Sequence, residues 1–314
     1  MAEIFPFLAL LPQTSFAETQ LFNGDLKKRL KEDQDANYLK ELLDHGVFAI
    51  DDRPCLYVYQ QEQNGETQTG IWAQVRPDAI KIHEQLLPEK IERIHEFRLR
   101  TGLEPKPVLL TYPPTDAIRR MINKFIGSAP LMVYNDGHQT HRFWRVTDPS
   151  ACQKTFESLD AFYMADGHHR LAANPFETLS ALLMDTTEIR VKPYNRLVQA
   201  KLDLVDYFFI AAAEGPVLPT IKHHFGLLRE DRWYALTAKN PQQYDTEILA
   251  DIFDEIEYTP GIAGAPGKLL FTLCPLKIEE VMAAANAGVI LPPKSTWIEP
   301  KIPYGLLMCR HQPY

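Results

Sequence analysis

Cysteine is scarce in this chain, and the spacing of the few cysteines excludes the common cysteine-based sites. Cys55, Cys152, Cys274 and Cys309 are widely separated, and none of them belongs to a C-x-x-C pair. Zinc ribbons and thioredoxin-like redox centres both need closely spaced cysteines. We therefore expect unreactive thiols in a reduced, cytoplasmic compartment.

Long hydrophobic runs and a basic leader are also missing. No apolar stretch approaches the roughly 18 to 20 residues that a membrane-spanning helix needs. The first residues carry no positive charge, and Pro6 and Pro12 interrupt them, so we expect no signal peptide. A membrane is therefore not an expected partner.

Positive charge is in deficit. The 314 residues include 33 Lys and Arg against 41 Asp and Glu, a net charge of −8. This balance argues against an extended nucleic-acid face, although a local basic pocket for a small phosphate ligand is compatible with it. With 45% hydrophobic and 24% charged residues, the composition is globular and the length suits one large or two ordinary domains.

Apolar periodicity and turn signals predict an α+β fold, a mixed sheet with flanking helices. Start and stop signals predict a helix over 25–44 and another from Pro88 to Gly102. A β-hairpin is expected from 55–61 and 69–75 around Asn64-Gly65. Further along we expect a strand over 107–112, a helix opened by 113–116, and a second hairpin from 131–135 and 139–146.

The second half gives weaker signals. Asn174 and Pro175 form a good helix start, so the main helix after the central motif is expected to run from there towards Met184. We also expect helix over 202–213, a long loop over 258–267, a strand over 268–274 and a helix over 275–287. The chain is treated as one unit over 1–314, with a possible division into a core, 1–200, and a part, 201–314, that returns Lys294–Thr296 to the site.

Chemistry concentrates in five consecutive residues, Asp166-Gly167-His168-His169-Arg170. They offer a proton acceptor, a backbone that a ligand can approach closely, two imidazoles that titrate near neutral pH, and a bidentate anion clamp. This combination favours an anion or phosphate site. An Asp-Gly turn with solvated imidazoles and guanidinium, needing no ligand, is the alternative.

Two other segments carry candidate groups. Lys81-Ile82-His83-Glu84 places an acid-base pair before a helix, and in an extended backbone adjacent side chains point apart, so one of the two can face a site. Lys294-Ser295-Thr296 follows two prolines that hold the chain extended. It presents one cation and two hydroxyls to a phosphate or, as a structural tail, to a neighbouring backbone.

In this order, Lys81-Ile82-His83-Glu84, Tyr163-Met164-Ala165-Asp166-Gly167-His168-His169-Arg170 and Pro293-Lys294-Ser295-Thr296 with Pro300-Lys301 resemble the domain of unknown function 1015 family. The resemblance extends from Phe5-Pro6 to Gly305-Leu306, but the family's usual early Pro-Pro-Tyr-Asp-Val segment is not evident. The family is similar to the ParB and sulfiredoxin superfamily, which implies a nucleotide-binding core. Gly167-His168-His169-Arg170 resembles the Gly-Cys-His-Arg of sulfiredoxin. Because His168 replaces the cysteine, the resemblance implies phosphate binding without sulfinic-acid reduction.

The same superfamily includes free serine kinases, which implies transfer of a phosphoryl group from ATP or ADP, with Mg²⁺, to a small hydroxyl metabolite such as serine. Phosphoryl transfer needs positioning, charge neutralisation and a carboxylate that orients the acceptor. Asp166 or Glu84 would bind Mg²⁺ or accept the proton, with His83 as a further catalytic candidate. The residues implied in phosphate and nucleotide binding are Gly167, His168, His169, Arg170, Lys294, Ser295 and Thr296.

Two other functions stay open. A non-catalytic nucleotide-binding switch would share the phosphate clamp but need no essential carboxylate. A metal-dependent hydrolase would use His83, Asp166, His168 and His169, although adjacent histidines rarely converge on one metal. The sequence leaves the oligomeric state and the role of 214–267 open.

Overall fold

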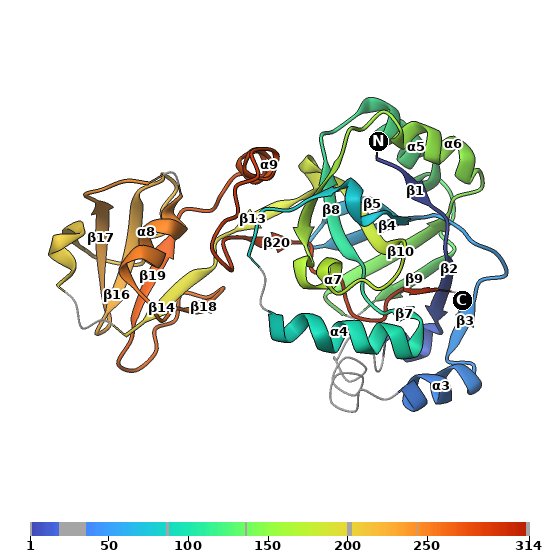
Figure 1. The fold of residues 1–314 in the computed structure, drawn as a ribbon, viewed down its shortest axis with the longest axis horizontal. Helices are drawn as coiled ribbons and strands as arrows, with labels where there is room; N and C mark the ends of the chain where they lie inside the picture. The colour runs from blue at the N-terminus through green and yellow to red at the C-terminus, as the bar shows by residue number, and fades with distance from the viewer. Residues whose placement is uncertain are drawn as a thin grey trace. The chain divides into compact units, whose positions relative to one another are not determined.

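The computed structural model describes residues 2–18, 36–85, 88–135, 137–199, 203–242 and 244–311, and it divides the chain into two units (Figure 1). Unit 1 comprises 1–82, 86–189 and 300–314, whereas unit 2 comprises 83–85 and 190–299. The predicted motifs are therefore divided. The 166–170 segment belongs to unit 1, and 83–84 and 294–296 belong to unit 2.

Unit 1 is built around a mixed nine-stranded sheet in the order β6-β11-β8-β12-β5-β4-β10-β9, with β1 beside β5. β8 and β12 run parallel, as do β6 and β11, and the other pairs are antiparallel. The strands are β1 Ile4–Phe5, β4 Tyr57–Gln63, β5 Glu66–Val75, β6 Ile80–Lys81, β8 Val108–Tyr112, β9 Met132–Asn135, β10 Gln139–Arg145, β11 Phe162–Asp166 and β12 Leu179–Asp185.

A smaller sheet and several helices complete unit 1. This sheet has the order β3-β2-β21-β7, so the last described strand of the chain, β21, lies between two early ones. Its strands are β2 Leu8–Pro12, β3 Phe48–Ile50, β7 Leu103–Glu104 and β21 Met308–Arg310. The helices are α1 Thr14–Phe16, α3 Ala36–Asp44, η2 Pro77–Ala79, α4 Pro88–Thr101, α5 Asp116–Ile126, α6 Pro149–Phe156, α7 His168–Ala172 and η3 Thr186–Glu188.

The two faces of the large sheet bury different side chains. Alternate residues of β5, such as Ile71 and Ala73, join one apolar cluster with Ile118 of α5 and Phe156 of α6. Trp72, between them in sequence, packs on the other face among aromatic rings that include Tyr59 and Phe143. This period-two pattern is what a strand buried on both faces requires.

Unit 2 holds a six-stranded antiparallel sheet in the order β15-β17-β16-β19-β14-β18. Ile248 and Leu249 of helix α8 pack against its core. A two-stranded sheet, β13 with β20, is separate. The elements are β13 Arg190–Lys192, β14 Asn195–Val198, η4 Leu204–Asp206, β15 Phe208–Ala213, β16 His224–Arg229, β17 Arg232–Ala238, α8 Asp245–Ile252, β18 Glu257–Thr259, β19 Leu269–Leu273, α9 Ile278–Asn286 and β20 Trp297–Glu299.

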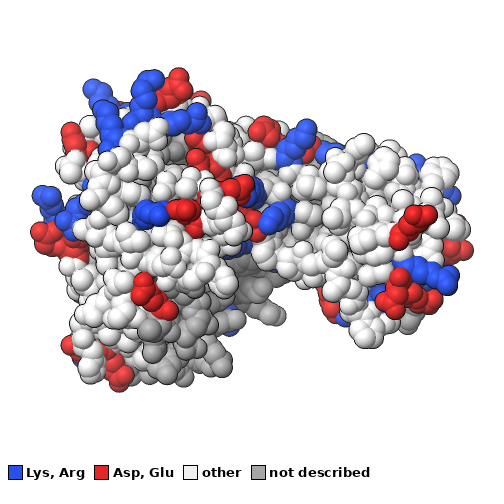
Figure 2. Space-filling model, turned by 180° about the vertical axis from the view of Figure 1, so that it is seen from behind, with Lys and Arg blue, Asp and Glu red and all other residues white. Residues whose placement is uncertain are grey.

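Two expectations from the sequence, the lack of a membrane-spanning helix and the lack of an extended basic face, can be compared with this structure. None of the helices that the structure describes is long and apolar enough to span a bilayer. Figure 2 shows basic and acidic side chains interspersed over the face that it views.

Several local predictions are confirmed. The first hairpin is β4 and β5, and Asn64 and Gly65 at its tip both have positive φ, 53° and 79°, as a type I′ turn requires. α4 begins at Pro88 and ends before Gly102, whose φ is 65°. The predicted strand and helix after it are β8 and α5, and the second hairpin is β9 and β10. Of the predicted helix 25–44, residues 36–44 form α3, and 25–35 lie outside the described residues.

The helix expected from Pro175 towards Met184 is wrong. Residues Leu179–Asp185 form β12, a central strand in which all seven residues are buried. A short apolar run buried on both faces does not distinguish helix from strand by periodicity. The helix comes earlier instead, as α7, and it contains His169 and Arg170, which the sequence placed ahead of a helix.

The helix expected over 202–213 is also wrong. Phe208–Ala213 is β15, the edge strand of the sheet of unit 2, and it pairs with β17. Three alanines favour helix by propensity, but pairing along the whole strand overrides that weak preference. Residues 201–202 lie outside the described residues.

Gly70 in the middle of β5 offers a test of this packing. A Cβ atom there would lie 2.4 Å from the carbonyl oxygen of Leu183 and 2.7 Å from Met184 Cγ. We expect Gly70→Ala to lower the free energy of unfolding by about 1–3 kcal/mol through overpacking, measured by urea denaturation. Gly127→Ala is the control, because its nearest neighbour would be 3.8 Å away; equal losses in both variants would contradict the packing of β5 on β12.

Candidate functional site

The central motif forms a tight turn between β11 and α7. Gly167 has φ +110°, a conformation that L side chains rarely adopt. A Cβ atom on Gly167 would lie 2.6 Å from Arg170 Nη2 and 2.9 Å from Arg170 Nε. Glycine is therefore needed twice, for the backbone angle and for the guanidinium that folds back over it.

Asp166 at the end of β11 is engaged through both carboxylate oxygens. Oδ2 accepts from Arg170 Nη2 at 2.7 Å, and Oδ1 accepts from Lys301 Nζ at 2.7 Å. Burial opposes ionisation, but Arg170, Lys301 and Lys106 outweigh it and hold the pKa of Asp166 well below its usual range. Asp166 is therefore a counter-ion that fixes two cations in position.

The charges around this turn leave an excess of positive charge. Three cations, Arg170, Lys301 and Lys106, act on the single carboxylate of Asp166. The side chains of Arg170 and Lys301 are 19% and 35% exposed, so a ligand can reach them from solvent. Since α7 has five residues, its backbone dipole contributes little, and the side-chain cations would supply most of the attraction for an anion.

A buried ion pair supports the turn from below. Arg98 on α4, 2% exposed, donates from Nη1 to the backbone oxygen of Arg170 at 2.6 Å and pairs through Nη2 with Glu104 Oε1 at 2.7 Å. Glu104, fully buried on β7, also accepts from the backbone N–H of Ser180 at 2.6 Å and lies 2.8 Å from His311 Nε2. Burial alone would raise the pKa of Glu104, but Arg98 and His311 lower it below its usual value.

The two histidines of the motif differ in exposure. His168 is buried and His169 is half-buried. Among the residues that the structure describes, the only three metal-binding side chains whose ligand atoms lie within 4.8 Å of one another are Glu104, Cys309 and His311. Asp166, His168 and His169 therefore do not converge as a hydrolase site would require.

In unit 2 the predicted pair His83 and Glu84 lies in extended chain beside Leu291. The backbone N–H of Leu291 donates to His83 O at 2.8 Å, and Glu84 forms a parallel bridge with Leu291. His83 is fully buried, and burial lowers its pKa to about 4, so the imidazole is neutral at pH 7. Glu84 Oε1 accepts from the backbone N–H of Lys294 at 3.1 Å.

The Pro-Lys-Ser-Thr segment is held on several sides. Lys294 has φ +60°, its Nζ lies 5.4 Å from the ring centroid of Tyr194, and its carbonyl oxygen accepts from Arg196 Nη2 at 3.1 Å. Ser295 Oγ donates to Pro292 O at 2.7 Å, and Thr296 is buried. Unit 2 thus brings Glu84, Lys294 and Ser295 together, and part of their polar capacity serves to fix this segment.

Neither predicted carboxylate ligand suits Mg²⁺. Asp166 is enclosed by three cations, and Glu84 accepts a backbone hydrogen bond and interacts with the charge of Arg196. A divalent cation prefers carboxylate oxygens whose charge is not already compensated. The donor sets of Asp166 and Glu84 therefore do not fit the expected magnesium.

Several residues of this arrangement were not identified from the sequence. Arg98 lies in a helix rich in charged residues, where an Arg is normally expected to be exposed to solvent. Glu104 and His311 belong to no motif. Lys301 was noted beside Pro300 but given no role. The one weak signal for Lys301 was that it follows closely after Thr296, the last residue of the Pro-Lys-Ser-Thr segment.

A comparison with protein families decides the relationship of the chain. The model of the family described as protein of unknown function (DUF1015) matches residues 14–257. The chain belongs to the DUF1015 family. The match ends before Pro293–Thr296 of unit 2 and Lys301 of unit 1, so the family model covers neither of them. A search of curated proteins found no match to the sequence of this chain.

The DUF1015 chain is also similar in structure to solved proteins. SbnI with C-terminal truncation, from Staphylococcus aureus, is 12% identical over 73% of this chain and 82% of that chain, with a TM-score of 0.47. A free serine kinase in complex with AMP is 16% identical over 75% and 92%, with a TM-score of 0.42. A mutant free serine kinase in complex with ADP is 17% identical over 75% and 92%, with a TM-score of 0.43. Because these TM-scores are below 0.5, we argue function from the chain's own residues.

The buried ion pair predicts a large stability effect. We expect Glu104→Gln to lower the free energy of unfolding by about 3 kcal/mol or more, because Arg98 would remain buried without a counter-charge. Glu62→Gln, which removes a half-exposed partner of Arg142, should cost less than about 1 kcal/mol. Denaturant unfolding measures both, and similar losses would contradict the buried pair.

His83 predicts a pH effect of defined sign. Its folded pKa of about 4 lies below the unfolded value of about 6.5, so the unfolded chain binds the extra proton between these values. The free energy of unfolding should therefore fall as the pH drops from about 6.5 to about 4, by about 3 kcal/mol from this group. Denaturation at pH 7 and 4.5 should show a smaller drop for His83→Gln than for the wild type or the exposed-site control His45→Gln; an unchanged drop would contradict a neutral buried His83.

Proposed function

We propose that this DUF1015 protein binds a nucleotide through the turn of unit 1 and transfers a phosphoryl group from ATP or ADP to a small hydroxyl metabolite such as serine. The observation that carries the proposal is the set of three cations around Asp166 at a turn where Gly167 has a positive φ. A solvated turn would not need two cations fixed on one carboxylate, a guanidinium folded over a glycine and a buried arginine beneath.

The cations suit phosphate oxygens. Arg170 presents a planar fork for bidentate contact, and Lys301 adds a compact charge. Asp166 keeps both oriented before a ligand arrives, so little side-chain ordering is left to the binding step. A nucleotide would compete with Asp166 for the same donors, and the excess of positive charge favours that exchange.

The transfer step needs a base besides this clamp. The bond between the terminal phosphorus and the leaving nucleotide oxygen breaks, a bond forms to the acceptor oxygen, and the hydroxyl proton passes to the base. Asp166 is a poor base because of its low pKa and its two ion pairs, and His83 is fully buried. Glu84 of unit 2 is the remaining carboxylate that the sequence singled out, and Glu84→Gln tests whether the reaction uses it.

One observation favours the second candidate, a non-catalytic nucleotide-binding switch. Because both oxygens of Asp166 are held in ion pairs, the turn is a complete anion clamp without any catalytic carboxylate. A switch would lose function only with nucleotide binding. A kinase would lose turnover in Glu84→Gln while retaining binding.

Phosphorus NMR of the protein with ATP or ADP, Mg²⁺ and L-serine tests the proposal. A new phosphomonoester signal is expected from the wild type and from Arg142→Ala, a matched control whose Arg pairs with Glu62 at 2.7 Å. Arg170→Ala should lose the signal and bind nucleotide about tenfold or more weakly, because a charge-assisted contact is lost.

The same spectra distinguish the candidates. Intact nucleotide whose lines broaden with the wild type but not with Arg170→Ala would replace the kinase with the switch. Equal broadening with Arg170→Ala and Arg142→Ala would refute the phosphate site at this turn altogether.

A further inference from the structure

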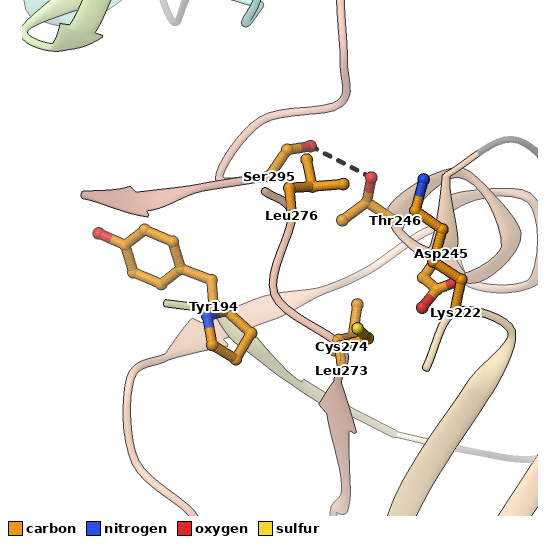
Figure 3. Close-up of a pocket in the computed structure, with 9 residues that line it drawn as sticks. Tyr194, Lys222, Asp245, Thr246, Leu273, Cys274, Leu276 and Ser295 are labelled. Carbon is orange, nitrogen blue, oxygen red and sulfur yellow. Dashed lines mark hydrogen bonds between the residues drawn. The ribbon is translucent and has the colours of Figure 1, made fainter. Parts of the chain in front are cut away.

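A small pocket lies wholly within unit 2. It is lined by residues that carry polar groups, Tyr194, Lys222, Asp245, Thr246 and Ser295, and by apolar residues that include Leu273 and Leu276. Figure 3 shows Asp245 and Lys222 on one side, Tyr194 on the opposite side, and the hydrogen-bonded pair Ser295 and Thr246, 3.2 Å apart, along a third.

Asp245 carries an unsatisfied acceptor. The residue is 4% exposed at the start of α8, and its Oδ1 accepts from the backbone N–H of His223 at 2.8 Å. Its second oxygen, Oδ2, is buried and has no hydrogen-bond partner among the described residues. A buried carboxylate oxygen left unpaired is costly, so native proteins normally supply a partner for it.

The surroundings of Asp245 compensate only part of its charge. Burial raises the pKa of Asp245, while the backbone N–H of His223, the imidazole of His223 and the charge of Lys222 act in the opposite direction. Nδ1 of His223 lies 3.4 Å from Oδ1, on the oxygen that is already hydrogen-bonded. Lys222 Nζ forms an ion pair with Glu280 and lies 5.4 Å from the ring centroid of Tyr244. A ligand that brings a positively charged donor would complete the compensation.

We infer that this pocket binds the ammonium group of a small amino acid, with Asp245 Oδ2 as its acceptor. An ammonium group forms charge-assisted hydrogen bonds with a carboxylate and has about the size of a water molecule. The cavity of about 10 Å³ is just large enough for one group of that size, so the rest of the amino acid would lie outside it. Lys222 on the same side, which already pairs with Glu280, would share its charge with the carboxylate of the amino acid.

A metal ion is a poorer match for the same pocket. Ca²⁺ takes six to eight oxygen ligands and Mg²⁺ takes six. Among the described lining residues Asp245 is the single carboxylate, and Lys222 adds positive charge. The ligand class is therefore an organic cation, and L-serine, the acceptor of the proposed function, is the first member to test; the inference rests on that proposal in this choice alone.

Titration of the full-length protein with L-serine, followed by two-dimensional amide NMR without nucleotide, tests the inference. L-serine should cause saturable shifts of resonances of unit 2, whereas L-lactate, which has a methyl and a hydroxyl but no ammonium group, should bind at least tenfold more weakly. Ethanolamine, which keeps the ammonium group and loses the carboxylate, should still bind.

Asp245→Asn removes the charge at almost constant shape and should weaken L-serine binding about tenfold or more. Asp251→Asn on the same helix is the matched control, because its exposed carboxylate accepts from Gln242 instead, and it should leave binding unchanged. If Asp245→Asn fails to fold, the comparison of L-serine with L-lactate on the wild-type protein still tests whether the pocket recognises an ammonium group.

Three results would overturn the inference: no saturable shifts with any amine, which would leave the pocket to a water molecule; equal affinity for L-lactate and L-serine; or unchanged binding in a folded Asp245→Asn. Because nucleotide is absent, these results are independent of the phosphate site. An active kinase that fails here would bind its acceptor elsewhere, and an amine-binding protein without kinase activity would keep this site.

Discussion

The ion pair between Arg98 and Glu104 is the interaction on which the turn at 166–170 depends. Both side chains are almost completely inaccessible to water, which costs several kcal/mol for each ion before their attraction is counted. Their geometry offsets this cost, because Glu104 gains Arg98, the N–H of Ser180 and His311 as partners. The pair therefore joins α4, β7, β12 and the end of the chain into one polar node within an apolar core.

The second donor of Arg98 gives that node its relevance to function. Nη1 of Arg98 donates to the backbone oxygen of Arg170 and so fixes the position of the α7 backbone. Asp166 accepts from Nη2 of Arg170 and so fixes the direction of the Arg170 side chain. Arg98 and Arg170 are like charges in proximity; burial and the charge of Arg170 lower the pKa of Arg98, while the charge of Glu104 raises it. Glu104 and Asp166 provide one carboxylate for each arginine. Removing either would leave a cation that the surroundings cannot stabilise.

Local elements could be predicted from the sequence where the signal is itself local. Asn64-Gly65 marks a turn that needs positive φ at both residues, and Pro88 and Gly102 mark the ends of α4, so these elements agree with the structure. β12 was predicted as a helix because it is buried on both faces, and periodicity does not reveal such burial. β15 was predicted as a helix because its pairing with β17 depends on the tertiary structure and not on the local sequence.

The same reason separates the residues of the candidate site that the sequence singled out from those that it did not. Asp166 to Arg170 could be found because the five groups are consecutive. Arg98, Glu104 and His311 come from three distant segments, and each looks ordinary alone, so only folding shows that they meet. Lys301 lies between these two cases. It was quoted with the motifs, beside Pro300, but its ion pair with Asp166 joins residues that are far apart in the sequence and could not be predicted from their spacing.

The role of Asp166 shows how geometry changes chemistry that composition suggests. A carboxylate beside a glycine and two histidines suggests a base or a magnesium ligand. A carboxylate held between two cations suits neither role, because its pKa is low and both of its oxygens are ion-paired. Acid-base chemistry must then come from a group with fewer cationic partners. Glu84 and Asp245 both belong to unit 2, and Asp245 keeps an oxygen without a hydrogen-bond partner among the described residues. Each unit is thus described by its own chemistry, unit 1 by cations that suit a phosphate and unit 2 by a carboxylate that suits a positively charged donor.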